Sequence, residues 1–233
     1  MSDTRTNAGV DNISTYKKMQ TWERPGERLI TLLSAGNLAT TQAVFGILEE
    51  HEKAAAQRSP GIMETSSMFQ TARLVGETVR SVIRDAADGG PKSEATFAAT
   101  FILGGQIEGG QTRLFLIYPE GNFIEATLDN PFFQIGEHKY GKPILVRAYD
   151  PDMTFEKAAK LLLVSFDSTL KSNVSVGLPL DLQIYENDSL RRGYERRLTA
   201  EDPYYRQVSD GWSDALRTAF NSLPDFSFGL DKP

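Results

Sequence analysis

The chain has 233 residues, of which 40% are hydrophobic and 24% charged, proportions that are ordinary for a globular protein and exclude a disordered chain. Its net charge of −6 disfavours a dedicated nucleic-acid binder, which usually presents a basic surface. The absence of cysteine excludes disulfides, thiolate metal sites and cysteine nucleophiles, and two histidines leave little room for a histidine-rich metal site. No apolar run approaches the ~20 residues of a membrane span, and the N-terminus lacks the apolar core of a signal peptide. We therefore expect a cytoplasmic protein with no cofactor, metal, nucleic-acid or membrane partner.

The first third of the chain predicts two strands followed by a helix. Residues 16–22 and 28–33 read as strands joined by a tight turn at Pro25-Gly26. Asn37 can cap a helix whose apolar stripe includes Val44 and Leu48.

The middle of the chain predicts a second helix and then a run of strands. The helix begins near Ser67, with a possible capping box, and ends at Gly89-Gly90. The strands are expected at residues 96–103, 112–118 and 123–128. The glycine-rich segment 104–110 lacks the spacing of a phosphate-binding loop, so we interpret it as a flexible loop between strands.

The last third predicts a short helix at 142–149, a long helix at 154–171, a strand at 180–184 and a final helix at 208–223. Four arginines between residues 191 and 197 favour a solvated face or a subunit contact over a nucleic-acid site. Helix pairs and strand runs are segregated along the chain, which predicts an α+β layered fold. No linker divides the chain, so residues 1–233 are expected to form a single domain.

The first 37 residues carry the most informative pattern. They open with Ser2-Asp3-Thr4-Arg5-Thr6-Asn7-Ala8-Gly9, Lys18 follows fifteen residues after Asp3, and Gly36 follows eighteen residues later within Leu33-Ser34-Ala35-Gly36-Asn37. This pattern resembles the proteasome β-subunits, and within them the bacterial Anbu (ancestral β-subunit) branch. The resemblance covers the order of elements over most of the chain and is specific at residue level mainly over residues 2–44.

The resemblance implies a fold, an activity and partners. The fold is the four-layer αββα sandwich of the N-terminal-nucleophile hydrolases, the partners are further copies of the chain in a ring or spiral, and the substrate is a peptide or protein. In this family an N-terminal threonine attacks an amide carbonyl, and its own α-amine takes the proton. By resemblance, Lys18 lowers the pKa of that amine, Asp3 holds Lys18, and the Gly36 N–H stabilises the oxyanion. Lys17 is expected to point to the opposite face of its strand.

The chain departs from the family pattern at its start. Met1 directly precedes Ser2-Asp3, so the first strand and the nucleophilic threonine are expected to be missing and the chain as given to be inactive. An alternative function is a non-catalytic, self-assembling subunit of the same fold; a weaker one is that removal of Met1 exposes Ser2 as the nucleophile. Asp3–Lys18 also fits a purely structural ion pair, and Gly36 fits a turn glycine.

Overall fold

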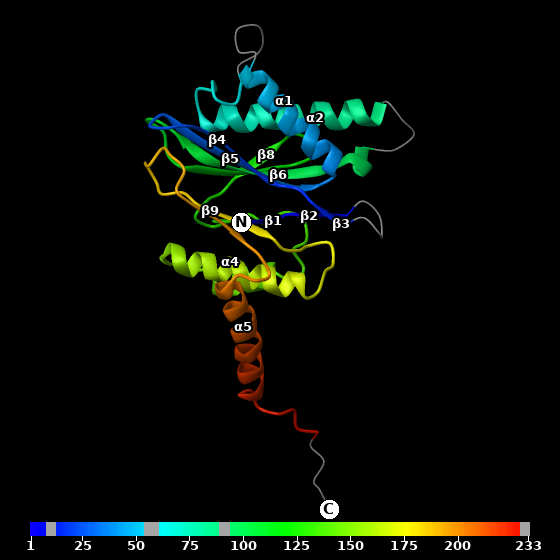
Figure 1. Ribbon diagram of the computed structural model, residues 1–233, viewed down its shortest axis with the longest axis vertical. Helices are drawn as coiled ribbons and strands as arrows, with labels where there is room; N and C mark the ends of the chain where they lie inside the picture. The colour runs from blue at the N-terminus through cyan, green and yellow to red at the C-terminus, as the bar shows by residue number, and fades with distance from the viewer. Residues whose placement is uncertain (8–12, 54–60, 89–93, 229–233) are drawn as a thin grey trace, which may run out of the picture.

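Five antiparallel strands form the larger sheet of the protein in a computed structural model that describes residues 1–7, 13–53, 61–88 and 94–228 (Figure 1). Their order in the sheet follows their order in the chain: β4 (Met19–Arg24), β5 (Arg28–Gly36), β6 (Ala99–Ile107), β7 (Arg113–Ile117) and β8 (Phe123–Glu125). The turn expected between the first two of these strands is present, and Gly26 adopts the positive φ of 79° that such a turn favours.

The central strand β6 corrects two predictions. A 3-10 helix (Glu94–Phe97) occupies the expected start of the strand, which begins at Ala99. The segment interpreted as a loop continues as strand through Ile107, because Gly105 lets the backbones of β5 and β6 approach closely. A Cβ added there would lie 2.2 Å from the carbonyl oxygen of Leu29, so the first part of the glycine-rich segment marks a close strand contact. Only residues 108–110 of the segment belong to the connection to β7.

Two helices, α1 (Leu38–Lys53) and α2 (Met68–Asp88), cover one face of the five-stranded sheet (Figure 1). Both predicted helix starts are confirmed: the Asn37 side chain accepts a hydrogen bond from the N–H of Thr40 at 3.0 Å, and the Ser67 hydroxyl accepts one from the N–H of Gln70 at 3.2 Å. The main hydrophobic core lies between this helix pair and the sheet. Its fully enclosed members include Ile30, Leu32, Val44, Leu48, Val75, Val79, Phe101, Leu103 and Ile117.

A smaller sheet lies on the side of the five-stranded sheet that faces away from α1 and α2 (Figure 1). It consists of β1 (Ser2–Asp3), β9 (Leu180–Ile184) and β10 (Tyr194–Leu198), in that order. A separate ladder joins β2 (Arg5–Asn7) to β3 (Ile13–Thr15). The sequence did not predict β10, because it has no apolar alternation and every residue in it except Leu198 is exposed.

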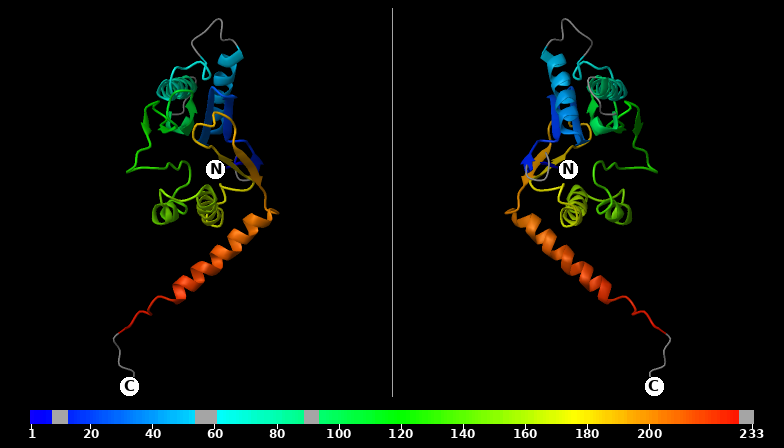
Figure 2. Two further views of the ribbon diagram at one scale, coloured as in Figure 1. Left: turned by 90° about the vertical axis from the view of Figure 1, so that its left-hand side faces the viewer. Right: turned by 90° about the vertical axis from the view of Figure 1, so that its right-hand side faces the viewer.

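Beneath the smaller sheet lie α3 (Lys142–Ala148) and α4 (Phe155–Leu170), so the molecule has helices, sheet, sheet and helices in succession (Figures 1 and 2). A second hydrophobic cluster joins α4 to the smaller sheet through Leu163, Leu180, Leu182 and Leu198. The last helix, α5 (Pro203–Asn221), begins beside α4 and projects away from the layers (Figure 2).

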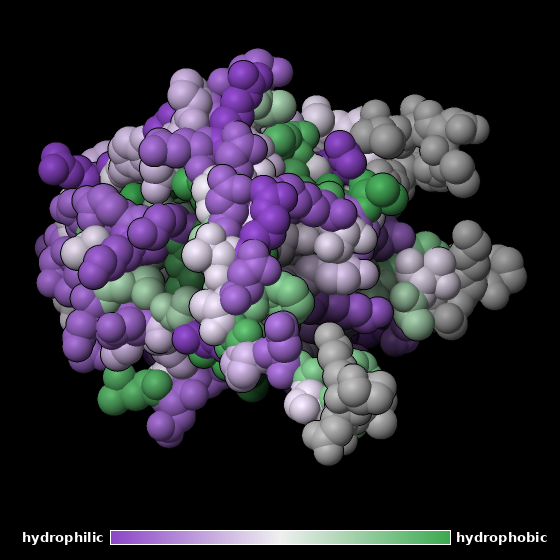
Figure 3. Space-filling view, turned by 90° about the horizontal axis from the view of Figure 1, so that it is seen from below, coloured by the Kyte–Doolittle hydropathy of each residue, from purple (hydrophilic) through white to green (hydrophobic). Residues whose placement is uncertain are grey.

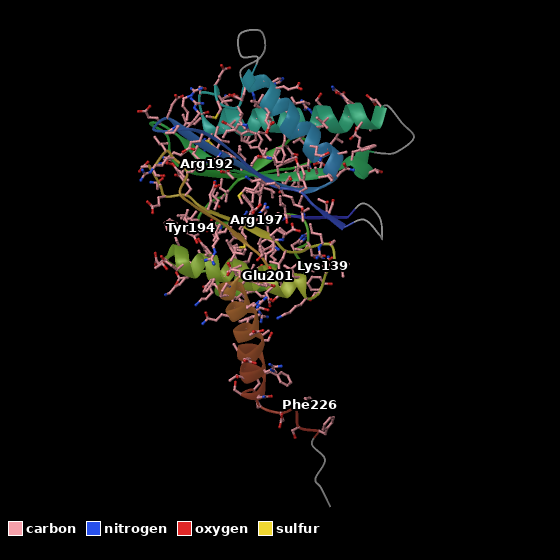
Figure 4. The ribbon with its side chains drawn as sticks, in the orientation of Figure 1. Lys139, Arg192, Tyr194, Arg197, Glu201 and Phe226 are labelled. Atoms are coloured by element: carbon pink, nitrogen blue, oxygen red, sulfur yellow. The ribbon has the colours of Figure 1, made fainter. Side chains whose placement is uncertain are left out.

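Polar contacts link the two sheets and account for the arginine-rich strand. The Thr31 hydroxyl donates to the side-chain oxygen of Gln183 at 2.7 Å, and Arg192 pairs with Glu23 at 3.2 Å. Arg197 pairs with Asp181 of the neighbouring strand at 2.7 Å (Figure 4). Arg192 and Arg197 therefore have carboxylate partners in their own chain.

No helix within the described ranges combines the length and the apolar character needed to cross a membrane.

Candidate functional site

The structure brings Asp3 and Lys18 together. The Lys18 ammonium nitrogen lies 2.7 Å from Oδ1 of Asp3, and their side chains are 18% and 11% exposed, respectively. The second carboxylate oxygen accepts hydrogen bonds from the backbone N–H groups of Arg5 at 3.2 Å and Gly177 at 3.3 Å. Both oxygens of Asp3 are thus occupied by donors, which fixes the carboxylate and, through it, the position of the ammonium group.

Each partner of this ion pair is held by a strand. Asp3 ends β1, where it lies opposite Leu180 of β9. Lys18 directly precedes β4, and its carbonyl oxygen accepts a hydrogen bond from the N–H of Ser34 in β5 at 3.0 Å. The pair therefore bridges the two sheets, one partner from each, and it depends on the packing of the two sheets against each other.

A cavity of about 700 Å³ extends from the ion pair to Gly36, which ends β5 just before α1. Asp3, Lys18 and Gly36 all line it, so the three residues singled out in the sequence share one site. Lys17 does not line this cavity; it borders a separate groove that Asp181 also lines. Of the two lysines only Lys18 reaches the site, as expected, but strand alternation is not the reason, because β4 begins at Met19.

Gly36 is required by the backbone at the end of β5. Its φ is +113°, a region that residues with a side chain rarely adopt, and an added Cβ would lie 2.6 Å from the carbonyl oxygen of Ala98. The next residue, Asn37, donates its N–H to that same carbonyl and caps α1. This corner therefore turns the chain from strand to helix directly at the cavity wall.

Replacing Gly36 by alanine should lower the free energy of unfolding by at least about 2 kcal/mol, because both the positive φ and the contact with the backbone of Ala98 become unfavourable. Gly46→Ala is the matched control: this helical glycine has open space around it, so the substitution should stabilise the protein by about 0.5–1 kcal/mol. Urea unfolding of both variants measures the difference. Equal stability of Gly36→Ala and the unchanged chain would show that the backbone at residue 36 adjusts to the added methyl group without a cost in stability.

The start of the chain lies in the same cavity. Burial lowers the pKa of the Met1 α-amine to about 6, and the negative charge of Asp181 offsets this only in part. The neighbouring Ser2 hydroxyl is buried and has no hydrogen-bond partner. Within the described ranges, no group of three or more metal-binding side chains is present that could hold an ion.

The sequence did not identify the polar side of α4 as part of the site. Ser165 and Thr169 of this helix, and Ser175 in the loop after it, also line the cavity. Ser165 and Thr169 are buried, and the Thr169 hydroxyl donates to the carbonyl oxygen of Ser165 at 2.9 Å. The available signal was the spacing of Ser165 and Thr169, which at four residues apart lie on the same side of a helix.

Comparison with known proteins places this geometry in a family. A scan against family profiles finds no match, and neither does a search of curated proteins. Solved structures do match over nearly the whole chain. An Anbu (Gly-1) mutant from Hyphomicrobium sp. strain MC1 is 55% identical with a TM-score of 0.88, over 97% of this chain and 92% of that one. Anbu (ancestral β-subunit) from Yersinia bercovieri is 47% identical with a TM-score of 0.89, over 97% and 94%.

A third match is the Anbu complex from Pseudomonas aeruginosa, whose structure is a helical assembly. It is 41% identical with a TM-score of 0.89 and covers 99% of this chain and 94% of that one. Identities of this size over almost the full length of both chains show common ancestry and not merely a shared fold, and they confirm the resemblance seen in the sequence. The chain belongs to the Anbu family of proteasome-type ancestral β-subunits.

Proposed function

We propose that this protein is a subunit of a self-assembling peptidase that hydrolyses amide bonds with an N-terminal threonine. The threonine and its strand would come from residues that precede Ser2-Asp3 in the full-length protein and that are not in the 233-residue chain. The observation that carries the proposal is the Asp3–Lys18 ion pair at 2.7 Å, in one cavity with Gly36.

The reaction follows from these groups. The threonine hydroxyl attacks the carbonyl carbon, its proton passes to the threonine α-amine, and the amine then protonates the departing nitrogen of the substrate. Water hydrolyses the resulting ester and restores the threonine. Lys18, held by Asp3, places a positive charge beside the amine, which lowers the pKa of the amine and keeps part of it in the basic form at neutral pH.

Gly36 is proposed to contribute the oxyanion contact. The corner that it forms lies at the cavity wall, and its backbone is fixed by the close approach of Ala98. A backbone N–H held in this way needs no reorganisation during the reaction, which is the property that makes such donors effective. The Gly36→Ala measurement above tests how firmly this corner is held.

Self-association is the second part of the proposal. The Pseudomonas aeruginosa relative, 41% identical to this chain, forms a helical assembly. We propose that this protein likewise associates with further copies of itself. A non-catalytic assembly subunit is the alternative that remains if the site proves inactive in a full-length protein.

The upstream DNA provides a direct test. The in-frame codons before Met1 should encode about 15 residues that begin Met-Thr and alternate apolar and polar, the length of a short strand hairpin. The N-terminus of the protein isolated from its native source, read by mass spectrometry, should be that threonine. A stop codon immediately upstream, together with a native protein that begins at Met1, would overturn the peptidase proposal and favour the non-catalytic subunit. A native protein that begins at Ser2 would overturn the threonine and leave Ser2 as the alternative nucleophile.

A further inference from the structure

A second carboxylate lines the cavity that holds Asp3 and Lys18. It belongs to Glu137, in the segment between β8 and α3, and two neutral donors hold it in place. Its Oε1 accepts a hydrogen bond from the Lys139 backbone N–H at 2.8 Å, and its Oε2 accepts one from the Asn173 side-chain amide at 2.7 Å. Each oxygen has a second lone pair, so the fixed carboxylate can accept further hydrogen bonds.

Within the described ranges, Glu137 has no lysine or arginine partner at ion-pair distance. Lys18 is taken up by its own ion pair, and the ammonium group of the exposed Lys139 acts on the carboxylate only from a distance. Arg5 also lines the cavity, but its guanidinium donates to the carbonyl oxygen of Val174 at 2.9 Å. The pKa of the Glu137 carboxyl is lowered from its ordinary value, chiefly because the Lys139 N–H donates to it. The cavity therefore contains a negative charge without a cation beside it.

The position of Glu137 distinguishes it from the charges of the outer surface. Seen from below, hydrophilic side chains occupy most of the visible face, with smaller apolar patches between them (Figure 3). Solvated charges of that kind are ordinary and need no partner. Glu137 instead lies on a cavity wall, and its hydrogen bonds to two separate segments keep its carboxylate in one place.

A neighbouring acceptor also lacks a donor. Gln134 lines the same cavity, and its side-chain oxygen is buried without a hydrogen-bond partner. The side-chain nitrogen of Gln134 donates to the backbone carbonyl oxygen of Glu137 at 3.1 Å, which keeps the two residues together. A buried acceptor without a donor is unfavourable, and a bound group that brings N–H donors would satisfy it.

The wall that carries Glu137 adjoins both parts of the proposed reacting centre. The preceding residue, Gly136, lies against the end of β5, where an added Cβ would be 3.2 Å from the Cβ of Ala35. Asn173, which holds the carboxylate, belongs to the same loop as Gly177, whose N–H binds the carboxylate of the ion pair. A peptide bond placed for attack would thus have Glu137 close to one of the residues that flank it.

We infer that Glu137, with Gln134 beside it, forms a subsite that selects peptides with a positively charged side chain next to the scissile bond. A lysine ammonium carries three N–H donors and a full charge, which match a fixed carboxylate and an unsatisfied amide oxygen. The inference rests on the peptide substrate of the proposed function.

The test measures the binding of three peptides to the full-length protein of that proposal, with its initial threonine replaced by alanine so that the peptides are not cleaved. The peptides are acetyl-Ala-Ala-X-Ala-Ala-amide, with lysine, norleucine or glutamate as X. In isothermal titration calorimetry, the lysine peptide should bind at least about 10-fold more tightly than the norleucine peptide. The glutamate peptide should bind more weakly than either.

Two substitutions make the result specific. Glu137→Gln keeps the size of the side chain and its ability to accept from the Lys139 N–H, so the fold should be unchanged by circular dichroism. The preference for lysine over norleucine should then fall to within a factor of about two. Glu120→Gln is the matched control: it removes the same charge from an exposed position between β7 and β8 that does not line the cavity, so the preference should remain.

The outcomes separate this inference from the proposal on which it rests. Equal affinity for the lysine and norleucine peptides, or a lysine preference that persists in folded Glu137→Gln, would overturn the subsite and leave the peptidase proposal standing. Tighter binding of the glutamate peptide would assign the charge preference to Arg5 and also overturn the inference. Failure of all three peptides to bind would overturn the subsite together with the peptide substrate. A lysine preference in a protein whose own threonine reacts with no electrophile would keep the subsite and overturn only the peptidase.

Discussion

Lys18→Ala should strongly slow the reaction of an N-terminally extended, threonine-initiated form of this protein with a threonine-reactive electrophile. The substitution removes the positive charge from the cavity, so the α-amine of the threonine would keep its proton and fail to accept another from the hydroxyl. The labelling rate should fall by about 10²–10³-fold, the effect typical of removing one preorganised group from an active site. The rate is followed by intact-protein mass spectrometry.

Two further substitutions make this result specific. Asp3→Asn should also slow labelling strongly, because the Lys18 ammonium would lose the carboxylate that holds it at 2.7 Å. Lys17→Ala should label at the unchanged rate, since Lys17 borders a different groove. The 233-residue chain, which has no N-terminal threonine, should not be labelled at that position in any variant. Equal labelling of folded Lys18→Ala and the unchanged extended chain would make the ion pair purely structural and favour the non-catalytic subunit.

The extended chain should also melt about 5 °C or more above the 233-residue chain at pH 7. Two causes contribute. An added strand would pair with the edge of β1 that has no partner among the described residues, and it would fill part of the 700 Å³ cavity. The extension would also replace the buried Met1 amine by a peptide bond. Differential scanning calorimetry of the two chains measures the difference.

The buried Met1 α-amine should make the difference in stability between the two chains depend on pH. Its pKa is about 6 in the folded chain, against 8.0 as the ordinary value. The unfolded state therefore binds more protons between pH 6 and 8, so the stability of the 233-residue chain should rise with pH across this window. The charged amine lowers the free energy of unfolding by about 1 kcal/mol at pH 7 and by about 3 kcal/mol well below pH 6. The extended chain should show no such rise.

A glycine–serine extension of equal length separates the two causes. It removes the charged amine but has no apolar alternation to form a strand, so it should abolish the rise of stability with pH while giving only part of the increase in melting temperature. If all three chains melt at the same temperature, no strand forms along β1, and the alignment of the chain start with the family is wrong.

The local pattern of the sequence determined most of the secondary structure of this protein. The caps at Asn37 and Ser67 and the apolar periodicity of the helices are short-range features, so they predicted α1, α2 and α4 within a few residues. The motifs around Asp3, Lys18 and Gly36 predicted a single site before any geometry was known. That inference depended on a resemblance to a family, because nothing in the spacing itself places the three residues together.

Tertiary structure decided what depends on contacts between distant segments. The strand β10 is polar and is defined by its pairing with β9, and β6 continues through a glycine-rich stretch because β5 lies close against it. Ser165 and Thr169 enter the site only because α4 packs beneath the smaller sheet. The Asp3–Lys18 pair joins two different sheets, so its 2.7 Å separation follows from how those sheets pack and not from the fifteen residues between them.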